Sequence, residues 1–216
     1  MLLAVDCGNT NIVMSVFDDE AICCQWRLET KGPHSGKAYL DVLTQQLTKI
    51  SCSPQDIDGC VIASVVPDIT PHLSSFATNI LGVVPVIVGA PGVTLALEID
   101  IDNPAEVGAD RLVNAVAVAH LGLVPAIVVD FGAATTFDIV RTAQTDKHKA
   151  CYAGGVISPG VHRSSEALAM AAAQLPQISV DQFDAQLPVL GTSTVSAMRS
   201  GVLWGYVGLV EGILAR

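Results

Sequence analysis

Positively charged side chains are scarce in this sequence. The 216 residues include 11 Lys and Arg against 21 Asp and Glu, which gives a formal net charge of −10 at pH 7. The few basic residues are scattered and form no patch that could neutralise a phosphate backbone. The composition therefore argues against nucleic acid as a partner.

Long apolar runs and an export signal are also missing. The longest stretch without a charged residue near the middle spans residues 112–129, and Asn114, His120 and Pro125 interrupt it. Such a stretch predicts a helix, a turn and a buried strand rather than a membrane span. No basic segment followed by an apolar one opens the chain, so we expect a cytoplasmic protein that does not bind membranes.

Cysteine pairs and metal-ligand spacings are lacking as well. The six cysteines form no C-x-x-C pair, and the five histidines show no spacing typical of a metal site. Free cysteines are among the most buried residue types, so we expect reduced thiols in the core. The absence of a Gly-x-Ser-x-Gly elbow gives no support to a hydrolytic triad.

The chain does contain enough apolar sequence to fold. It is 50% hydrophobic and 15% charged, a composition typical of globular proteins, and it is long enough for one large domain or two small ones. The apolar patterns predict strands at 2–6, 11–17, 21–28, 60–66, 83–88 and 125–130, and helices at 38–50, 69–80, 105–121 and 161–173. The uninterrupted apolar run at 60–66 predicts a strand buried on both faces.

Two similar motifs follow apolar strands. Asp6-x-Gly8-x-Thr10 ends the first strand, and Asp130-x-Gly132-x-x-Thr135 ends a later one. Either motif alone is compatible with an ordinary hairpin turn, because glycine and small polar residues favour turns. Together they predict two similar halves that face one nucleotide, an architecture of the actin-like kinases.

The residue types in these motifs suit phosphate chemistry. Glycine lets the backbone approach a phosphate without a Cβ clash, and the N–H groups of the turn can point at its oxygens. A strand-end aspartate such as Asp6 can orient Mg²⁺ or its bound waters beside the β- and γ-phosphates of a nucleotide.

A third segment with chemical potential lies between the two motifs. In Gly108-Ala109-Asp110-Arg111, the carboxylate can accept a hydroxyl proton and the guanidinium can grip an anionic group bidentately. The same residues are also compatible with exposed charges at the start of a helix. The sequence pattern alone leaves both interpretations open.

With these segments together, the chain resembles the type III pantothenate kinases, members of the acetate and sugar kinase, Hsp70 and actin superfamily. The resemblance spans nearly the whole chain and is carried by 6–11, 108–111, 130–136, 154–160, Ser193-Thr194 and the helical stretch 201–212. It implies an α/β fold of two ribonuclease-H-like halves. Residues 1–105 would form the half with the phosphate loop. Residues 106–216 would form a half with the substrate and cation motifs and the dimer helices, shortened at its C-terminal end.

The resemblance implies ATP-dependent phosphorylation of pantothenate to 4′-phosphopantothenate, the first step of coenzyme A biosynthesis. The implied ATP-binding residues are Asp6, Cys7, Gly8, Asn9, Thr10, Asn11, Ile12, Val13 and Ala133. The implied pantothenate-binding residues are Gly108, Ala109, Asp110, Arg111 and Thr194.

The resemblance also implies particular roles for some of these residues. Asp110 would be the catalytic base, and Asp6 would lie near Mg²⁺, directly or through water. Asp130 matches the family's ligand for K⁺ or NH₄⁺. Thr194 matches a substrate contact contributed across a homodimer whose active site lies at the subunit interface.

Two departures from the family pattern keep an alternative open. Ala133 stands where the family usually has threonine, and family members typically continue beyond the position that matches Arg216. A catalytically impaired dimeric homologue with a ligand-binding or transcription-accessory role is therefore the alternative. A phosphatase of the same superfamily fits less well, because the Gly-Ala-Asp-Arg segment matches the kinases.

Overall fold

The computed structural model describes residues 1–145, 147–171, 175–180, 184 and 186–216. The chain forms two compact units. The first contains Met1–Val128 and Asp138–Gly154, and the second contains Val129–Phe137 and Gly155–Arg216. These units differ in their residues from the predicted halves, 1–105 and 106–216. The division into those halves therefore stays a prediction.

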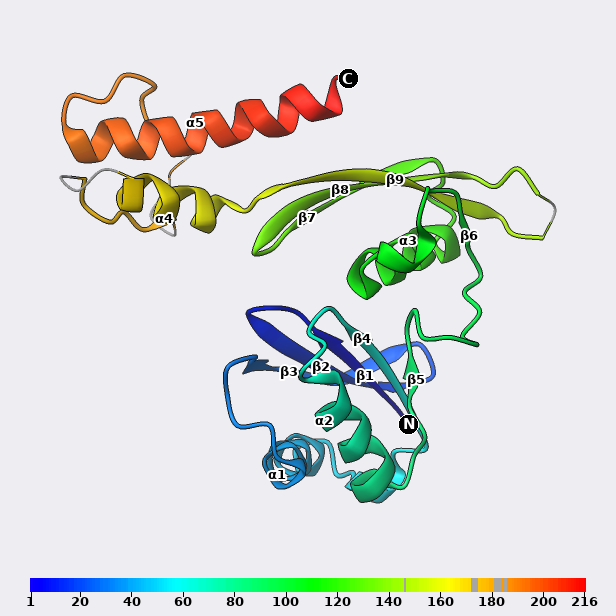
Figure 1. Cartoon of the computed structure of the whole chain (residues 1–216). Helices are drawn as coiled ribbons and strands as arrows, with labels where there is room; N and C mark the ends of the chain where they lie inside the picture. Colours follow the sequence, from blue (N-terminus) through cyan, green and yellow to red (C-terminus); the bar gives the residue numbers. More distant parts are fainter. Residues whose placement is uncertain (146, 172–174, 181–183, 185) are drawn as a thin grey trace. The chain divides into compact units, whose positions relative to one another are not determined.

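The first unit is built on a five-stranded sheet with the order β3-β2-β1-β4-β5 (Figure 1). Strands β1 (Leu2–Cys7), β2 (Asn11–Asp18) and β3 (Ala21–Glu29) form an antiparallel meander. Strand β4 (Gly59–Ser64) runs parallel to β1, and the short β5 (Val86–Ile87) runs parallel to β4. The predicted strands are present, although β5 is shorter than the predicted 83–88.

Helices α1 (Gly36–Thr48) and α2 (Thr70–Ser75) pack with this sheet. A π-helical turn (Phe76–Leu81) continues α2, so the predicted helix 69–80 is found with an irregular second half. Leu43 and Leu47 of α1 and Leu73 of α2 are fully or almost fully buried against strand residues such as Leu3. Burial of such side chains is the main favourable contribution to folding.

Strand β4 is buried on both faces, as its apolar run predicts. Cys60 and Ile62 belong to the core shared with α1 and α2, whereas Ala63 belongs to a second core with α3 (Ala109–His120). Because side chains alternate along a strand, one strand can serve two cores.

Helix α3 begins later than the predicted residue 105. A 3₁₀ turn (Pro104–Glu106) comes first, and Val107 and Gly108 are extended, with ψ angles of 124° and 143°. Gly108 is therefore the N-cap, and Asp110 lies in the first helical turn.

The second sheet has the order β6-β9-β8-β7. Its strands are β6 (Glu98–Ile99), β7 (Ala126–Phe131), β8 (Ala134–Thr142) and β9 (Ala150–Pro159). Strand β7 was predicted to be buried, but it lies at the sheet edge, where Ile127 and Phe131 are 46% and 63% exposed. Its apolar sequence alone could not distinguish an edge strand from a central one.

Helices α4 (Val161–Ala171) and α5 (Thr194–Leu214) contact each other in the second unit. They correspond to the predicted helices at 161–173 and 201–212, of which residues 172 and 173 lie outside the described part of the chain. The mixed α/β architecture with two sheets agrees with the predicted fold class.

All six cysteines are free. Cys7, Cys60 and Cys151 are buried in the core as predicted, whereas Cys23, Cys24 and Cys52 are only partly buried. Two of these three lie on β3, the edge strand of the first sheet, which explains their exposure. No helix in the described ranges is long and apolar enough to cross a membrane.

Candidate active site

The candidate phosphate loop joins β1 to β2. Val5 and Cys7 of β1 point into the core, and Asp6 between them is exposed on the opposite face of the sheet. The N–H of Gly8 donates to the carbonyl of Asn11 over 2.9 Å, which closes a tight turn. An exposed carboxylate thus lies directly before a turn with exposed Asn9 and Thr10 side chains.

Thr30 holds this turn from the neighbouring strand end. Its N–H donates to the carbonyl of Thr10 over 3.0 Å, and its hydroxyl donates to the carbonyl of Gly8 over 2.7 Å. Thr30 is buried, and the sequence analysis did not identify it. The pairing of Asn11 with Glu29 in the β2–β3 register is the signal that places residue 30 beside the turn.

Two of the predicted ATP-binding residues have buried side chains. Ile12 is fully buried, and burial is the largest factor that raises the pKa of the Cys7 thiol. These side chains therefore pack as neutral core groups, and a nucleotide could meet only the backbone at these positions. The side chains of Asn11 and Val13 are partly buried.

The segment 108–111 begins helix α3. The carboxylate Oδ1 of Asp110 accepts a hydrogen bond from the N–H of Arg111 over 2.8 Å. A Cβ on Gly108 would lie 2.5 Å from this Oδ1 and 3.4 Å from Val65. A Cβ here would therefore displace the carboxylate, whereas the ψ of 143° and φ of −59° are open to other residues.

The phosphate turn and the segment 108–111 meet at Val65 within the first unit. The N–H of Val65 donates to the carbonyl of Cys7 over 3.0 Å, and the Val65 side chain borders Gly108. Ala109 is buried in the core that α3 shares with Ala63 of β4. The fold therefore brings two motifs together that are about a hundred positions apart in the sequence.

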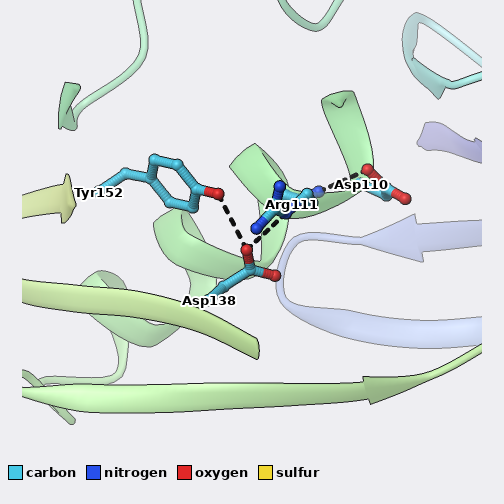
Figure 2. A network of polar contacts seen from close by, with 4 residues as sticks. All are labelled: Asp110, Arg111, Asp138 and Tyr152. Atoms are coloured by element: carbon cyan, nitrogen blue, oxygen red, sulfur yellow. Dashed lines mark hydrogen bonds and ion pairs between the residues drawn. The ribbon is translucent and has the colours of Figure 1, made fainter. Parts of the chain in front are cut away.

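Arg111 is held by a buried acid that the sequence analysis missed (Figure 2). Its Nε lies 2.6 Å from Oδ1 of Asp138 on β8, and the Asp138 side chain is fully buried. The hydroxyl of Tyr152 donates to the same oxygen over 3.0 Å, and the guanidinium carbon lies 5.6 Å from the centre of the Tyr152 ring. Asp110 lies on the other side of Arg111 in this view.

The remaining predicted residues belong to the second unit. Asp130 is exposed near the end of β7, and Ala133 is exposed in the turn before β8. The carbonyl of Ala133 accepts from the N–H of Gly160 over 3.1 Å. A Cβ on Gly160 would lie 2.7 Å from that carbonyl oxygen, so glycine is needed for this close packing.

Two hydroxyl residues of the second unit have different surroundings. Thr135 is fully buried, and its hydroxyl is hydrogen-bonded to Tyr206 of α5. Thr194 is the first residue of α5 and is exposed. The capping hydrogen bonds of that helix are made by Ser193 and Ser196, so the Thr194 side chain is not needed for them.

The carboxylates predicted to hold cations are single rather than clustered. The described ranges contain no group of three or more His, Cys, Asp or Glu side chains placed to hold a metal ion. Single exposed carboxylates fit Mg²⁺ that shares its oxygen ligands with nucleotide phosphates and water. The donor chemistry of Asp6 therefore suits a cation that arrives with its nucleotide.

Comparison with known proteins gives a consistent family match. A family model described as type III pantothenate kinase matches residues 2–216. The type III pantothenate kinase of Paramagnetospirillum magneticum is 46% identical over 216 residues, covering 100% of this chain and 80% of that protein. That of a Geobacillus species (strain WCH70) is 44% identical with the same coverage.

Solved structures resemble the fold at lower identity. A protein from Campylobacter jejuni, assigned to the Baf family of transcriptional activators, aligns with a TM-score of 0.52 at 20% identity over 98% of this chain and 78% of its own. A protein from Sinorhizobium meliloti, assigned as a 2-dehydro-3-deoxygalactonokinase, aligns with a TM-score of 0.51 at 15% identity. The alignment covers 100% of this chain and 81% of that protein. These likenesses concern the fold alone and confirm the predicted fold class. The alternative of an impaired accessory homologue gains no support from them.

Proposed function

The chain belongs to the type III pantothenate kinase family, and on that premise we propose that Asp110 is the base of its phosphoryl transfer. As a family member, the enzyme transfers a phosphoryl group from ATP to pantothenate and forms 4′-phosphopantothenate, in the direction of coenzyme A. Phosphoryl transfer depends mainly on positioning and on stabilising the charge of the transferred group. We therefore assign each residue of the site a role in binding, orienting or accepting a proton from the substrates.

The observation that carries the proposal is the fixed carboxylate of Asp110 in the first turn of α3. Its Oδ1 accepts a hydrogen bond from the N–H of Arg111, and the missing side chain of Gly108 leaves space for this oxygen. In the reaction, the hydroxyl oxygen of pantothenate forms a bond to the γ-phosphorus while the bond from that phosphorus to the bridging oxygen breaks and ADP leaves. Asp110 accepts the hydroxyl proton.

Arg111 is proposed to bind the carboxylate of pantothenate. Its guanidinium carries a charge at every working pH and presents planar donors that match a carboxylate. Arg111 follows Asp110 directly, so one helical turn supplies both the proton acceptor and the anchor for the substrate. Gly108 and Ala109 would contribute backbone contacts to the same substrate.

The segment 6–13 is proposed to bind the phosphates of ATP. The N–H groups of the turn and the exposed side chains of Asn9 and Thr10 supply donors, and Thr30 fixes the turn in place. Asp6 would hold Mg²⁺, directly or through water. That ion neutralises phosphate charge when it is bound.

Residues of the second unit are proposed to bind ATP, a monovalent cation and the substrate. Ala133 would contact ATP through its backbone, and Asp130 would bind K⁺ or NH₄⁺ through an exposed carboxylate. Thr194 would contact the substrate bound to the other subunit of a homodimer. We also propose that the enzyme works in the cytoplasm, where ATP is available.

The base assignment is tested by steady-state kinetics of Asp110→Asn. We expect kcat to fall by about 10²–10⁴ because the asparagine amide cannot accept the proton. Glu106→Gln is the matched control, since Glu106 is the acid that precedes the segment and its side chain accepts a hydrogen bond from the Asn103 amide. Near-normal kcat in Asp110→Asn would remove the base role.

The cation and dimer assignments have their own tests. Asp130→Ala should abolish the stimulation of activity by K⁺ over Na⁺, and unchanged stimulation would place the cation elsewhere. If Thr194 acts across the interface, mixing inactive Asp110→Asn with Thr194→Ala subunits should restore activity, because a mixed dimer retains one intact site. No restoration in a sample shown to exchange subunits would contradict the shared site.

A further inference from the structure

We propose that Asp138 and Tyr152 are positioning residues that fix the guanidinium of Arg111 so that its outer edge receives the carboxylate of pantothenate. The inference rests on the proposed function, in which Arg111 binds that carboxylate. Neither residue belongs to the segments that the sequence analysis identified. All four residues of this network lie within the first unit (Figure 2).

The first argument is the burial of Asp138. Its side chain is fully buried, and a buried carboxylate is costly unless it is paired and hydrogen-bonded. Replacing a buried ion pair by apolar residues is often neutral or stabilising, so stability alone gives a weak reason for an acid at this position. A requirement for a defined Arg111 orientation gives a stronger one.

The second argument is which donor of Arg111 the acid uses. Asp138 takes Nε, the donor nearest the stem of the side chain, at 2.6 Å. Nη2 is buried and has no hydrogen-bond partner among the described residues. Because the guanidinium is planar and rigid, fixing Nε also fixes the direction of the Nη1–Nη2 edge. This donor on that edge is therefore one that the carboxylate of a ligand can satisfy.

The third argument is the double role of Tyr152. Its ring supports the guanidinium at 5.6 Å, and its hydroxyl donates to the Asp138 oxygen that also receives Nε. Burial, followed by the charge of Asp138, raises the pKa of Tyr152, so the hydroxyl stays protonated and remains a donor at neutral pH. Tyr152 therefore restrains both Asp138 and Arg111.

A purely electrostatic role of Asp138 makes the opposite prediction. If the acid only neutralised Arg111, its removal would leave a stronger positive charge and pantothenate would bind more tightly. If the acid orients Arg111, its removal releases the guanidinium and pantothenate binds more weakly. The sign of the change in the KM for pantothenate therefore separates the two roles.

The test is the kinetics of Asp138→Asn, which keeps the size of the side chain and removes its charge. We expect the KM for pantothenate to rise about tenfold, with the KM for ATP and kcat within about twofold of the original values. Tyr152→Phe keeps the ring and should raise the same KM by about threefold. Asp100→Asn is the matched control, because the Asp100 carboxylate pairs with Arg141 rather than with Arg111, and only the backbone N–H of Asp100, which the substitution keeps, bonds to Tyr152.

Arg111→Gln and the double variant with Asp138→Asn complete the design. If Asp138 acts through Arg111, the double variant should show the same KM for pantothenate as Arg111→Gln alone. An unchanged KM in Arg111→Gln would instead contradict the proposed function itself. A raised KM in Arg111→Gln, together with an unchanged or lowered KM in Asp138→Asn, would overturn the positioning role. Should Asp138→Asn fail to fold, an unchanged KM in Tyr152→Phe would overturn it equally.

Discussion

Gly108 illustrates how a single missing side chain can shape this site. An added Cβ would lie 2.5 Å from Oδ1 of Asp110, so the carboxylate could not keep its present position. Glycine is thus selected by space at this N-cap, and its backbone angles would allow other residues.

Gly108→Ala should therefore lower kcat while the protein stays folded. The flexible end of Asp110 can move away from the new methyl group, so the cost falls on the geometry of catalysis, where displacement of about 1 Å can reduce the rate about 10²-fold. Measuring kcat beside the midpoint of thermal unfolding checks this expectation. An unchanged kcat would show that the present Asp110 position is not the catalytic one.

Ala133 offers a gain-of-function prediction at the residue scale. Ala133→Thr adds a hydroxyl at an exposed position of the turn before β8, where the resemblance leads us to expect a threonine. A hydrogen bond to a charged group contributes about 1.5–3 kcal/mol, so the KM for ATP should fall about ten- to a hundredfold. An equal KM for ATP in the two proteins would mean that residue 133 does not face the nucleotide.

At the scale of elements, the β1–β2 turn depends on the end of β3. Thr30 bonds to the carbonyls of both Gly8 and Thr10, and the antiparallel register of β2 and β3 brings it there. The conformation of the candidate phosphate loop is therefore set by an element other than its own two strands.

Thr30→Val should weaken ATP binding and lower stability. The Gly8 carbonyl would lose its hydroxyl donor, which we expect to cost about 1–3 kcal/mol in the free energy of unfolding. Thr48→Val is the matched control, because that hydroxyl donates to the Thr44 carbonyl on the exposed side of α1. Urea unfolding and the KM for ATP test this prediction. A loss of stability no larger than that of the control would contradict the role of Thr30 in holding the turn.

The sequence predicted the presence of helices and strands better than their boundaries and the contacts between their side chains. The apolar run of β4 was sufficient to predict burial on both faces, because no polar alternation interrupts it. The start of α3 was wrong, since the extended angles of Val107 and Gly108 arise from packing that propensity does not describe. Asp110 and Arg111 were accessible through their motif, but Asp138 lies 27 positions from Arg111 on another element, and only the fold reveals their contact.

At the scale of the whole molecule, the buried acidic groups of the first unit predict a weakness at alkaline pH. Burial raises the pKa of Cys60 from 9.0 to about 11, and mainly burial raises that of Tyr39 from 10.0 to about 12. The folded protein therefore retains protons that the unfolded chain releases in this window.

The free energy of unfolding should fall as the pH rises above 9. The stability linked to a raised pKa is complete below the unfolded value and is lost progressively towards the folded value, so the window is about pH 9–11 for Cys60 and about 10–12 for Tyr39. Urea unfolding at a series of pH values measures this slope. Cys60→Ala should flatten it between pH 9 and 11, and an unaltered slope would contradict the assignment to Cys60.

The most direct test of the central claim is a single-turnover transfer of labelled γ-phosphate from ATP to pantothenate by the purified chain in K⁺ and Mg²⁺. The account predicts labelled 4′-phosphopantothenate, formed only when pantothenate is present. It also predicts a rate about 10²–10⁴ lower in Asp110→Asn, with pantothenate binding retained. Transfer at the original rate in Asp110→Asn, or ATP cleavage by the folded protein without labelled phosphopantothenate, would contradict the account.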